Sequence, residues 1–467
     1  MRKGRFLHKI CLLSVSFFLI TFINQLKAQD IVGNWVGQLQ SSGIKLRLVF
    51  HFTNLNDTLN CTLDSPDQSA FGLKAEKNYF QNDSVFVQFG KLQASYKGML
   101  QEDTIKGVFI QNNQQFPLNL MKTSQNDFSI KRPQNPIKPY PYLSKDVMIK
   151  TRDGRVLAGT LTQPPKGKIK HAVLLVSGSG PQNRDEEILN HKPFLVLSDY
   201  LTKKGIAILR YDDRGVGKST GNFSKATTFD LAEDALFAFN YLEKKYKKSK
   251  VGIIGHSEGG LIAPIIASEY TNVDFIVLMA GPSVTGKEVI LDQSELIMRK
   301  SGMPDSLISN QIEFSKELLD FIIDEKNKED LKKKSINLTK SLITKYHIEV
   351  PSYSTIDKVS RQTVETYLSP WMNTFLKINP LDYISKVNCP ILALFGGNDL
   401  QVSLRANLMK MYKQSKEKPN MKVKVFEGLN HLFQKSETGL PSEYGQIEET
   451  LNEGVMKEIA GWIIGLN

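Results

Sequence analysis

The chain has 467 residues, of which 41% are hydrophobic and 23% charged, and its formal net charge is +12. This composition excludes collagen-like, low-complexity and largely disordered chains, and the length predicts two or three domains. Residues 1–28 contain five basic residues and no acidic one, which leaves +7 for the remainder. The other lysines are scattered or mixed with acids, as in 325–334, so we expect no nucleic-acid partner.

Residues 1–28 have the layout of a secretory signal peptide. Basic residues between Arg2 and Lys9 precede an apolar run from Ile10 to Ile23, and a polar segment ends at Ala28. The run is shorter than the ~20 residues that a membrane span needs. We therefore predict cleavage after Ala28 and export to the periplasm or the medium, with no stable membrane span afterwards. An uncleaved N-terminal anchor is the alternative.

Cysteine and histidine usage indicates neither a disulfide framework nor a metal site. Once Cys11 is removed, only Cys61 and Cys389 remain, and the seven histidines form no HExxH or His-x-His pair. We expect no metal and no cofactor. The oligomeric state is not predicted.

Residues 29–130 predict a small antiparallel β domain, either a barrel or a sandwich. Apolar and mostly polar residues alternate from Ile44 to Phe52, and similar short runs follow, separated by turn-forming Asn and Asp residues. Without a cluster of titratable residues, this domain is expected to be an accessory module for binding or packing. The proline-rich residues 131–144 are predicted to form an extended, semi-rigid linker.

Residues 145–467 alternate apolar strands with amphipathic helices, which is typical of a parallel α/β sheet covered on both faces. Within them, residues 283–385 are charged and helix-favouring and contain no strong strand pattern. We predict that this insertion is a helical cap that covers the site and sets substrate size. Trp371, Met372 and Phe375 are expected in its acyl pocket or its packed core.

The sequence Gly255-His256-Ser257-Glu258-Gly259 follows one predicted strand and opens a predicted helix. G-x-S-x-G in this context is typical of a nucleophile elbow, which presents the serine at the N-terminus of a helix. Ser257 is therefore the predicted nucleophile, and His256 is expected to pack away from it. A serine at this position argues against dehalogenase or epoxide hydrolase chemistry, which needs a carboxylate there.

A serine nucleophile needs a base and an orienting acid. Asp399 follows the predicted strand 391–395, and His431 follows the predicted strand 423–426. Both lie beyond carboxyl ends of strands, in the chain order Ser, Asp, His that this fold requires. We predict Ser257, Asp399 and His431 as a catalytic triad.

The oxyanion of an acyl-transfer intermediate needs two N–H donors. The N–H of Glu258, which follows the nucleophile, is the first candidate, and Ser179 in the glycine-rich loop 177–181 is the second, with Gly180 as its alternative. A separate motif, Gly215-Val216-Gly217-Lys218, does not meet the phosphate-loop spacing. We expect Asp213 and Arg214 beside it to form a buried ion pair that fixes the loop.

Five segments together resemble the exported α/β-hydrolases of the serine aminopeptidase-like and dienelactone hydrolase-like branch. These segments are SGSGPQNRDE, YDDRGVGKSTG, GHSEGG, GGNDLQV and LNHLFQ. The resemblance covers roughly residues 140–467, and the preceding β domain resembles an N-terminal module of many members. It implies Ser257, Asp399 and His431 as the triad and Ser179 and Glu258 at the oxyanion positions. It implies no particular substrate.

The predicted function is a cofactor-free serine hydrolase that cleaves carboxylic esters of small molecules through an acyl-enzyme. The first alternative is a serine aminopeptidase acting on short peptides, which needs an acid to pair with the substrate's ammonium group. The candidates for that acid are Glu258, Asp185, Glu186 and Glu187. The second alternative is a binding protein that has lost catalysis.

Overall fold

The computed structural model describes residues 31–466, except 42–43, 56–57, 69, 113, 127, 129, 326, 328 and 352–353. The predicted signal peptide, residues 1–28 with its cleavage site, lies outside the described residues. The chain divides into two compact units, residues 1–130 and 131–467. Within the described part of the chain, no helix combines the length and the apolar character needed to cross a membrane.

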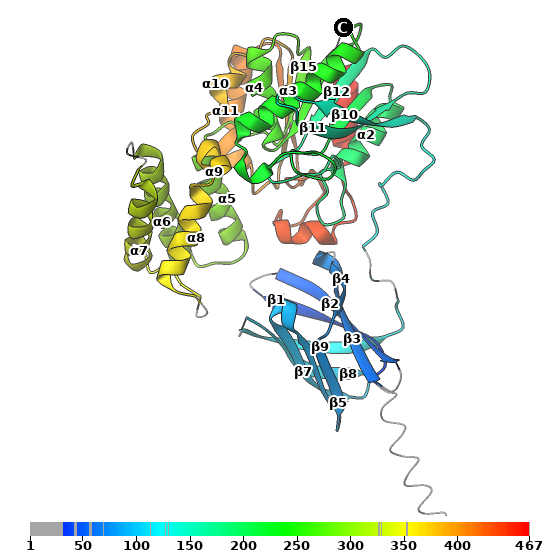
Figure 1. Ribbon diagram of the computed structural model, residues 1–467, viewed down its shortest axis with the longest axis vertical. Helices are drawn as coiled ribbons and strands as arrows, with labels where there is room; N and C mark the ends of the chain where they lie inside the picture. The colour runs from blue at the N-terminus through cyan, green and yellow to red at the C-terminus, as the bar shows by residue number, and fades with distance from the viewer. Residues whose placement is uncertain are drawn as a thin grey trace, which may run out of the picture. The chain divides into compact units, whose positions relative to one another are not determined.

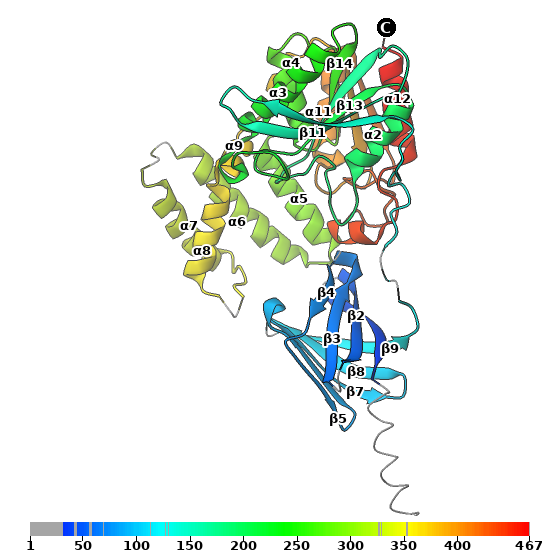
Figure 2. The ribbon, with the colours of Figure 1, turned by 45° about the vertical axis from the view of Figure 1, so that its right-hand side comes forward.

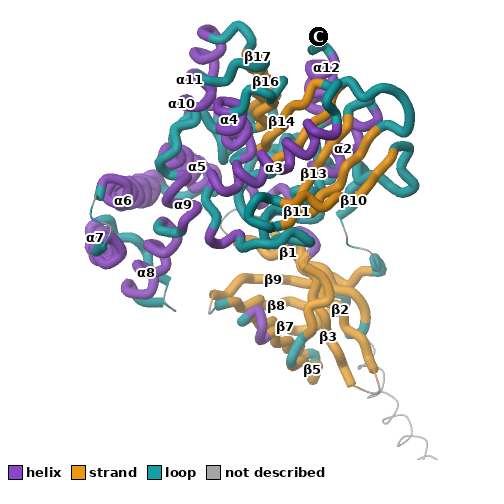
Figure 3. The backbone as a smooth tube through the Cα atoms, turned by 45° about the horizontal axis from the view of Figure 1, so that its top comes forward, coloured by secondary structure: helices purple, strands orange, loops and turns teal. Residues whose placement is uncertain are grey.

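The first unit contains one antiparallel sheet of nine strands in the order β4-β3-β2-β1-β9-β8-β7-β6-β5. The strands are β1 Gly33–Ser41, β2 Ile44–Leu55, β3 Thr58–Ser65, β4 Ala70–Lys74, β5 Lys77–Gln81, β6 Ser84–Phe89, β7 Ala94–Gln101, β8 Thr104–Gln111 and β9 Gln114–Thr123. The sheet curls around a core that contains the fully buried Trp35, Phe50 and Tyr96 (Figure 3). A single curled sheet is closer to the barrel than to the sandwich.

The second unit is built on an eight-stranded sheet in the order β10-β11-β13-β12-β14-β15-β16-β17. The strands are β10 Leu143–Lys150, β11 Val156–Gln163, β12 His171–Val176, β13 Ala207–Tyr211, β14 Lys250–His256, β15 Phe275–Met279, β16 Ile391–Gly396 and β17 Met421–Phe426. The expectation of a wholly parallel sheet is wrong for β10 and β11, which pair antiparallel. The turn between them is far too short for a parallel crossover.

Helices cover both faces of this sheet (Figures 1 and 2). Apolar residues of α3 (Thr228–Lys245), α4 (Gly259–Glu269) and α11 (Leu404–Glu417) pack on one face. Those of α2 (Pro193–Lys203) and α12 (Glu453–Ile464) pack on the other. The last helix, α12, begins at Glu453, where the Asn452 side chain accepts the Gly454 N–H and caps it.

The cap is inserted between β15 and β16. Its helices are α5 Gly286–Lys300, α6 Asp305–Asp324, α7 Leu331–Lys345, α8 Ile356–Tyr367, α9 Pro370–Phe375 and α10 Leu381–Ile384. α6 and α7 contribute Phe314, Leu318 and Leu342 to a separate small apolar core. The predicted fold class, an α/β-hydrolase sheet with a helical cap after a small antiparallel β domain, is confirmed.

The start of the proline-rich segment 131–144 is bonded to the second unit itself. The Arg132 guanidinium donates to the main-chain carbonyls of Leu189, Gly445 and Ile447 at 2.8–3.0 Å. The Gln134 side chain donates to the Leu451 carbonyl and accepts from the N–H groups of residues 450 and 451. These hydrogen bonds from two side chains to main-chain groups fix the point at which the chain enters the second unit.

Candidate active site

The predicted nucleophile lies in a tight turn between β14 and α4. Ser257 has φ +52°, in the left-handed region that costs a non-glycine residue energy. The flanking glycines have no space for a side chain. A Cβ at Gly255 would lie 1.9 Å from the Gly259 carbonyl oxygen, and a Cβ at Gly259 would lie 2.1 Å from the Val176 carbonyl oxygen. The glycines therefore allow the close approach of strand and helix that this turn requires.

Asp399 and His431 are brought together from the loops that follow β16 and β17. His431 Nδ1 lies 2.8 Å from Oδ2 of Asp399, and both residues are buried. The other carboxylate oxygen of Asp399 accepts the N–H groups of Gln401 and Val402 at 2.7 and 2.9 Å. These bonds direct Oδ2 at the imidazole, so Nδ1 carries the proton and Nε2 is left as a base.

Ser257 and His431 line the same cavity, which has a volume of about 100 Å³. The hydrogen bonds among the described residues include none between Ser257 Oγ and the His431 ring. Contacts of this type commonly tighten only when substrate binds. The serine at the turn and a histidine oriented by Asp399 thus border one small cavity.

The loop after β12 carries Ser179, which is exposed to the cavity beside Ser257. Among the described residues, neither the Ser179 N–H nor the Glu258 N–H forms a hydrogen bond. A Cβ at Gly178 would lie 3.2 Å from Cβ of Ser257, so this loop passes very close to the nucleophile. Both N–H groups, which the sequence predicts as oxyanion donors, are therefore without an acceptor among the described residues.

The loop 212–221 holds the Ser179 loop in place. The Asp212 carboxylate binds the Arg184 guanidinium through both oxygens, at 2.9 and 2.6 Å. Asp213 accepts the Gln182 N–H at 2.9 Å, and burial raises the pKa of the Asp213 carboxyl to about 8. The predicted Asp213–Arg214 pair is wrong, because each side chain has a different partner.

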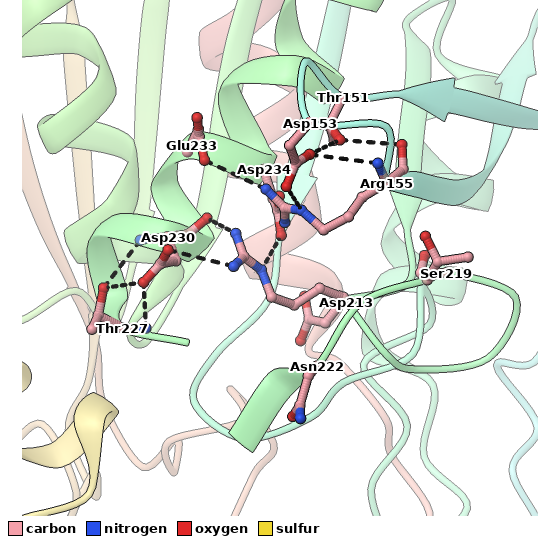
Figure 4. Close-up of polar contacts among 12 residues, drawn as sticks. Thr151, Asp153, Arg155, Asp213, Ser219, Asn222, Thr227, Asp230, Glu233 and Asp234 are labelled. Atoms are coloured by element: carbon pink, nitrogen blue, oxygen red, sulfur yellow. Dashed lines mark hydrogen bonds and ion pairs between the residues drawn. The ribbon is translucent and has the colours of Figure 1, made fainter. Parts of the chain in front are cut away.

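Arg214 binds α3 instead. Its Nε donates to Asp234 at 2.6 Å, and Asp234 also accepts from Arg155 at 2.6 Å. Figure 4 shows this network. Asp230, which also pairs with Arg214, accepts from the N–H and the hydroxyl of Thr227 at the start of α3. These contacts of Arg214 anchor the loop 212–221 to α3. The role of this loop is therefore structural.

A second cavity, of about 200 Å³, lies between the elbow and the cap. Its cap-side lining is mostly apolar and comprises Val289, Ile290, Gln293, Trp371, Met372 and Phe375. Trp371 stacks on Phe375 and donates its indole N–H to Glu258 at 2.8 Å. Trp371, Met372 and Phe375 fill both expected places, since they line this cavity beside Ser257 and also pack against the apolar core of the second unit. Ser179, Ser257 and Gln401 border both cavities.

Each carboxylate considered for an ammonium group already has partners inside the protein. Glu258 accepts from Trp371 and from Thr228, and burial raises the pKa of Glu258. Asp185 pairs with Arg210, Glu187 accepts from Asn183, and Glu186 accepts from His256 and Gly178. The contact between Glu186 and His256 joins residues 70 positions apart. Neither sequence pattern nor spacing signals this contact.

The chain is similar to known proteins in sequence. The sequence profile of the family described as Serine aminopeptidase, S33, matches residues 192–437, more than half of the chain. Esterase EstD of Thermotoga maritima is 27% identical over 329 residues, which cover 70% of this chain and 69% of that protein.

Similar solved structures include the esterase Pf2001 of Pyrococcus furiosus, with 19% identity, a TM-score of 0.41 and coverage of 69% of this chain and 92% of that one. They also include a proline iminopeptidase of Mycobacterium smegmatis, with 12% identity, a TM-score of 0.42 and coverage of 68% and 98%. The profile match, together with the fold and its elbow, shows that the chain belongs to the α/β-hydrolase family of the S33 serine aminopeptidases.

Proposed function

We propose that the protein is a serine hydrolase that cleaves carboxylic esters through an acyl-enzyme. The observation that carries the proposal is that the buried His431–Asp399 pair borders the same cavity as Ser257, which lies at a strained turn between strand and helix. This combination needs no group from outside the chain to activate the nucleophile.

In the proposed reaction, Ser257 Oγ attacks the ester carbonyl carbon while His431 Nε2 takes its proton. The negative oxygen of the intermediate accepts from the N–H groups of Ser179 and Glu258. His431 then gives the proton to the leaving alkoxide, which departs as the alcohol and leaves the acyl group on Ser257. A water molecule repeats the attack, with its proton passing through His431, and the carboxylic acid leaves.

The two cavities suggest a division of the ester. The larger one, with its apolar cap side, suits the acyl group, and the smaller one beside His431 suits the alcohol. The larger cavity has a volume of only about 200 Å³. We therefore expect short to medium acyl chains to be preferred over long ones.

An ester is favoured over an aminopeptidase substrate because all four candidate acids are already bonded within the protein. Oε2 of Glu186 and Oε2 of Glu258 have no hydrogen-bond partner among the described residues, but both atoms are buried, so an ammonium group would have to enter the protein interior to reach them. The relative EstD is named an esterase, which supports an ester over a peptide as the substrate.

The test uses the full-length protein, p-nitrophenyl esters of increasing acyl length and a fluorophosphonate probe. We expect turnover and labelling in the wild type and neither in Ser257→Ala, with kcat lowered up to ~10⁶-fold. Peptides with free N-termini form the comparison panel. Faster cleavage of those peptides than of any ester would overturn the ester assignment, and an unlabelled wild type would overturn the serine mechanism.

A further inference from the structure

Glu186 is a buried carboxylate that the proposed reaction does not use. It lies in the loop between β12 and α2, is 4% exposed, and has φ +51°. Its Oε1 accepts the Gly178 N–H at 2.7 Å and faces His256 Nδ1 at 2.9 Å. Oε2 is buried and has no hydrogen-bond partner among the described residues. Such a burial is costly, and its position beside the nucleophile calls for an explanation.

His256 continues the chain of hydrogen bonds on the other side. Its Nε2 lies 2.9 Å from the main-chain carbonyl oxygen of His431. A carbonyl only accepts, so Nε2 carries a proton, and an ionised Glu186 requires a second proton on Nδ1. Burial opposes this charge, but the Glu186 carboxylate, the bond to the His431 carbonyl and the nearby Asp399 together outweigh burial and hold the pKa of His256 above its ordinary value.

The two side chains therefore connect three loops around Ser257. Gly178 immediately precedes Ser179, His256 immediately precedes Ser257, and the carbonyl at the far end belongs to His431 itself. We propose that Glu186 and His256 are a positioning dyad that fixes the spacing between the oxyanion loop, the nucleophile and the base. This proposal rests on the function proposed above.

A pair of opposite charges with no net charge suits the position of the dyad next to His431 for an electrostatic reason. The His256 and His431 rings lie with centroids 4.9 Å apart, and Asp399, Asp213 and Tyr444 are the other ionisable groups around the dyad. An unpaired charge on either member of the dyad would act directly on the His431 imidazole. As an ion pair, the dyad holds geometry without imposing a net charge.

The dyad is tested with Glu186→Gln, which changes one atom of the carboxylate, and with His256→Gln. Each loses at least one charge-assisted hydrogen bond, so we expect kcat to fall ~10- to ~100-fold with KM little changed. His171→Gln is the matched control. His171 is also a buried histidine near a main-chain carbonyl, that of Leu466 at 3.4 Å, but it begins β12 at the end of the strand away from Ser177.

Proton NMR of the full chain supplies a readout that needs no turnover. The His431 Nδ1 proton, bonded to Asp399, should give a low-field resonance that shifts or broadens in Glu186→Gln and stays in place in His171→Gln. Melting temperatures show whether each variant is folded.

A loss of kcat together with a displaced resonance, in folded Glu186→Gln, supports the dyad. A kcat close to the wild-type value, an unmoved resonance, or an equal loss in His171→Gln overturns it. If the wild type turns over no ester, the proposed function fails, and the resonance alone decides whether the dyad positions His431. If Glu186→Gln does not fold, His256→Gln carries the same comparison.

Discussion

The two compact units bury different kinds of side chain. The curled sheet of the first unit surrounds aromatic residues such as Trp35, Phe50 and Tyr96. The carboxyl edge of the second sheet instead buries ionisable residues, which are Glu186, Arg210, Asp212, Asp213, Arg214, His256, Glu258, Asp399 and His431. Burying charge contributes little to stability even when the charges are paired, whereas burying aromatic area contributes much. The buried aromatic residues of the first unit therefore stabilise its fold, whereas the buried ionisable residues of the second unit depend on its fold for their positions.

Asp399→Asn is expected to separate catalysis from stability most strongly. The asparagine side chain cannot hold His431 in the tautomer with a proton on Nδ1, so kcat should fall by ~10⁴-fold. Because shape and volume are retained, the unfolding midpoint should change little. Steady-state kinetics and thermal unfolding measure both quantities. A kcat near that of the wild type would remove Asp399 from the proposed triad.

Trp35→Ala should show the reverse behaviour. Trp35 is fully buried and donates its indole N–H to the Ile31 carbonyl at 2.7 Å. Its loss should lower the free energy of unfolding of the first unit by about 3–5 kcal/mol and leave kcat on a small ester unchanged. Met121→Ala, at a residue that is 63% exposed on β9, is the control and should change neither. Loss of hydrolysis in a folded Trp35 variant would mean that the first unit contributes to catalysis.

His191 links stability to pH within the second unit. Burial lowers the pKa of this histidine to about 4, from 6.5 in the unfolded chain. Between these values the unfolded state binds more protons, so the native state loses stability as pH falls. In His191→Gln this loss is absent, and the stability advantage of the wild type should shrink by about 2 kcal/mol from pH 7 to pH 5. Urea unfolding at the two pH values measures it, and parallel curves would contradict the assignment.

The smallest effect is expected at Trp371, an aromatic residue that is bonded to a buried ionisable residue, Glu258. Trp371→Phe keeps an aromatic ring in the cap but removes the N–H that Glu258 accepts. Because this side of the proposed acyl cavity is then no longer held by the bond to Glu258, the ratio of kcat/KM for hexanoyl and acetyl esters should change ~5- to 10-fold. Trp462→Phe on α12, which packs against Phe275 on the other side of the sheet, is the matched control. An unchanged ratio would show that the cap does not set acyl size through this bond.

Local sequence patterns predicted most of the second unit. Apolar strands and the G-x-S-x-G turn locate Ser257, and the strand ends locate Asp399 and His431, because each of these signals lies within a few residues. The antiparallel β10–β11 pair was foreseeable from its short turn. The true partners of Arg214 and Glu186 were not, since adjacent residues such as Asp213 and Arg214 point to different elements and their contacts bridge tens of residues. Long-range polar contacts leave no periodic trace in a single sequence.

Several residues around the site hold backbone conformations that glycine would adopt at lower cost. Glu186, Ser257 and Phe433 have φ between +51° and +57°, and each such position costs roughly 1–3 kcal/mol. At Ser257, whose side chain is small, a laboratory selection that rewarded heat resistance alone would therefore favour glycine and discard the proposed nucleophile, whereas the buried ring of Phe433 contributes more packing energy than its backbone strain costs. Directed evolution of this protein toward higher temperature has to screen for turnover in every round, or else exclude codon 257 from the library.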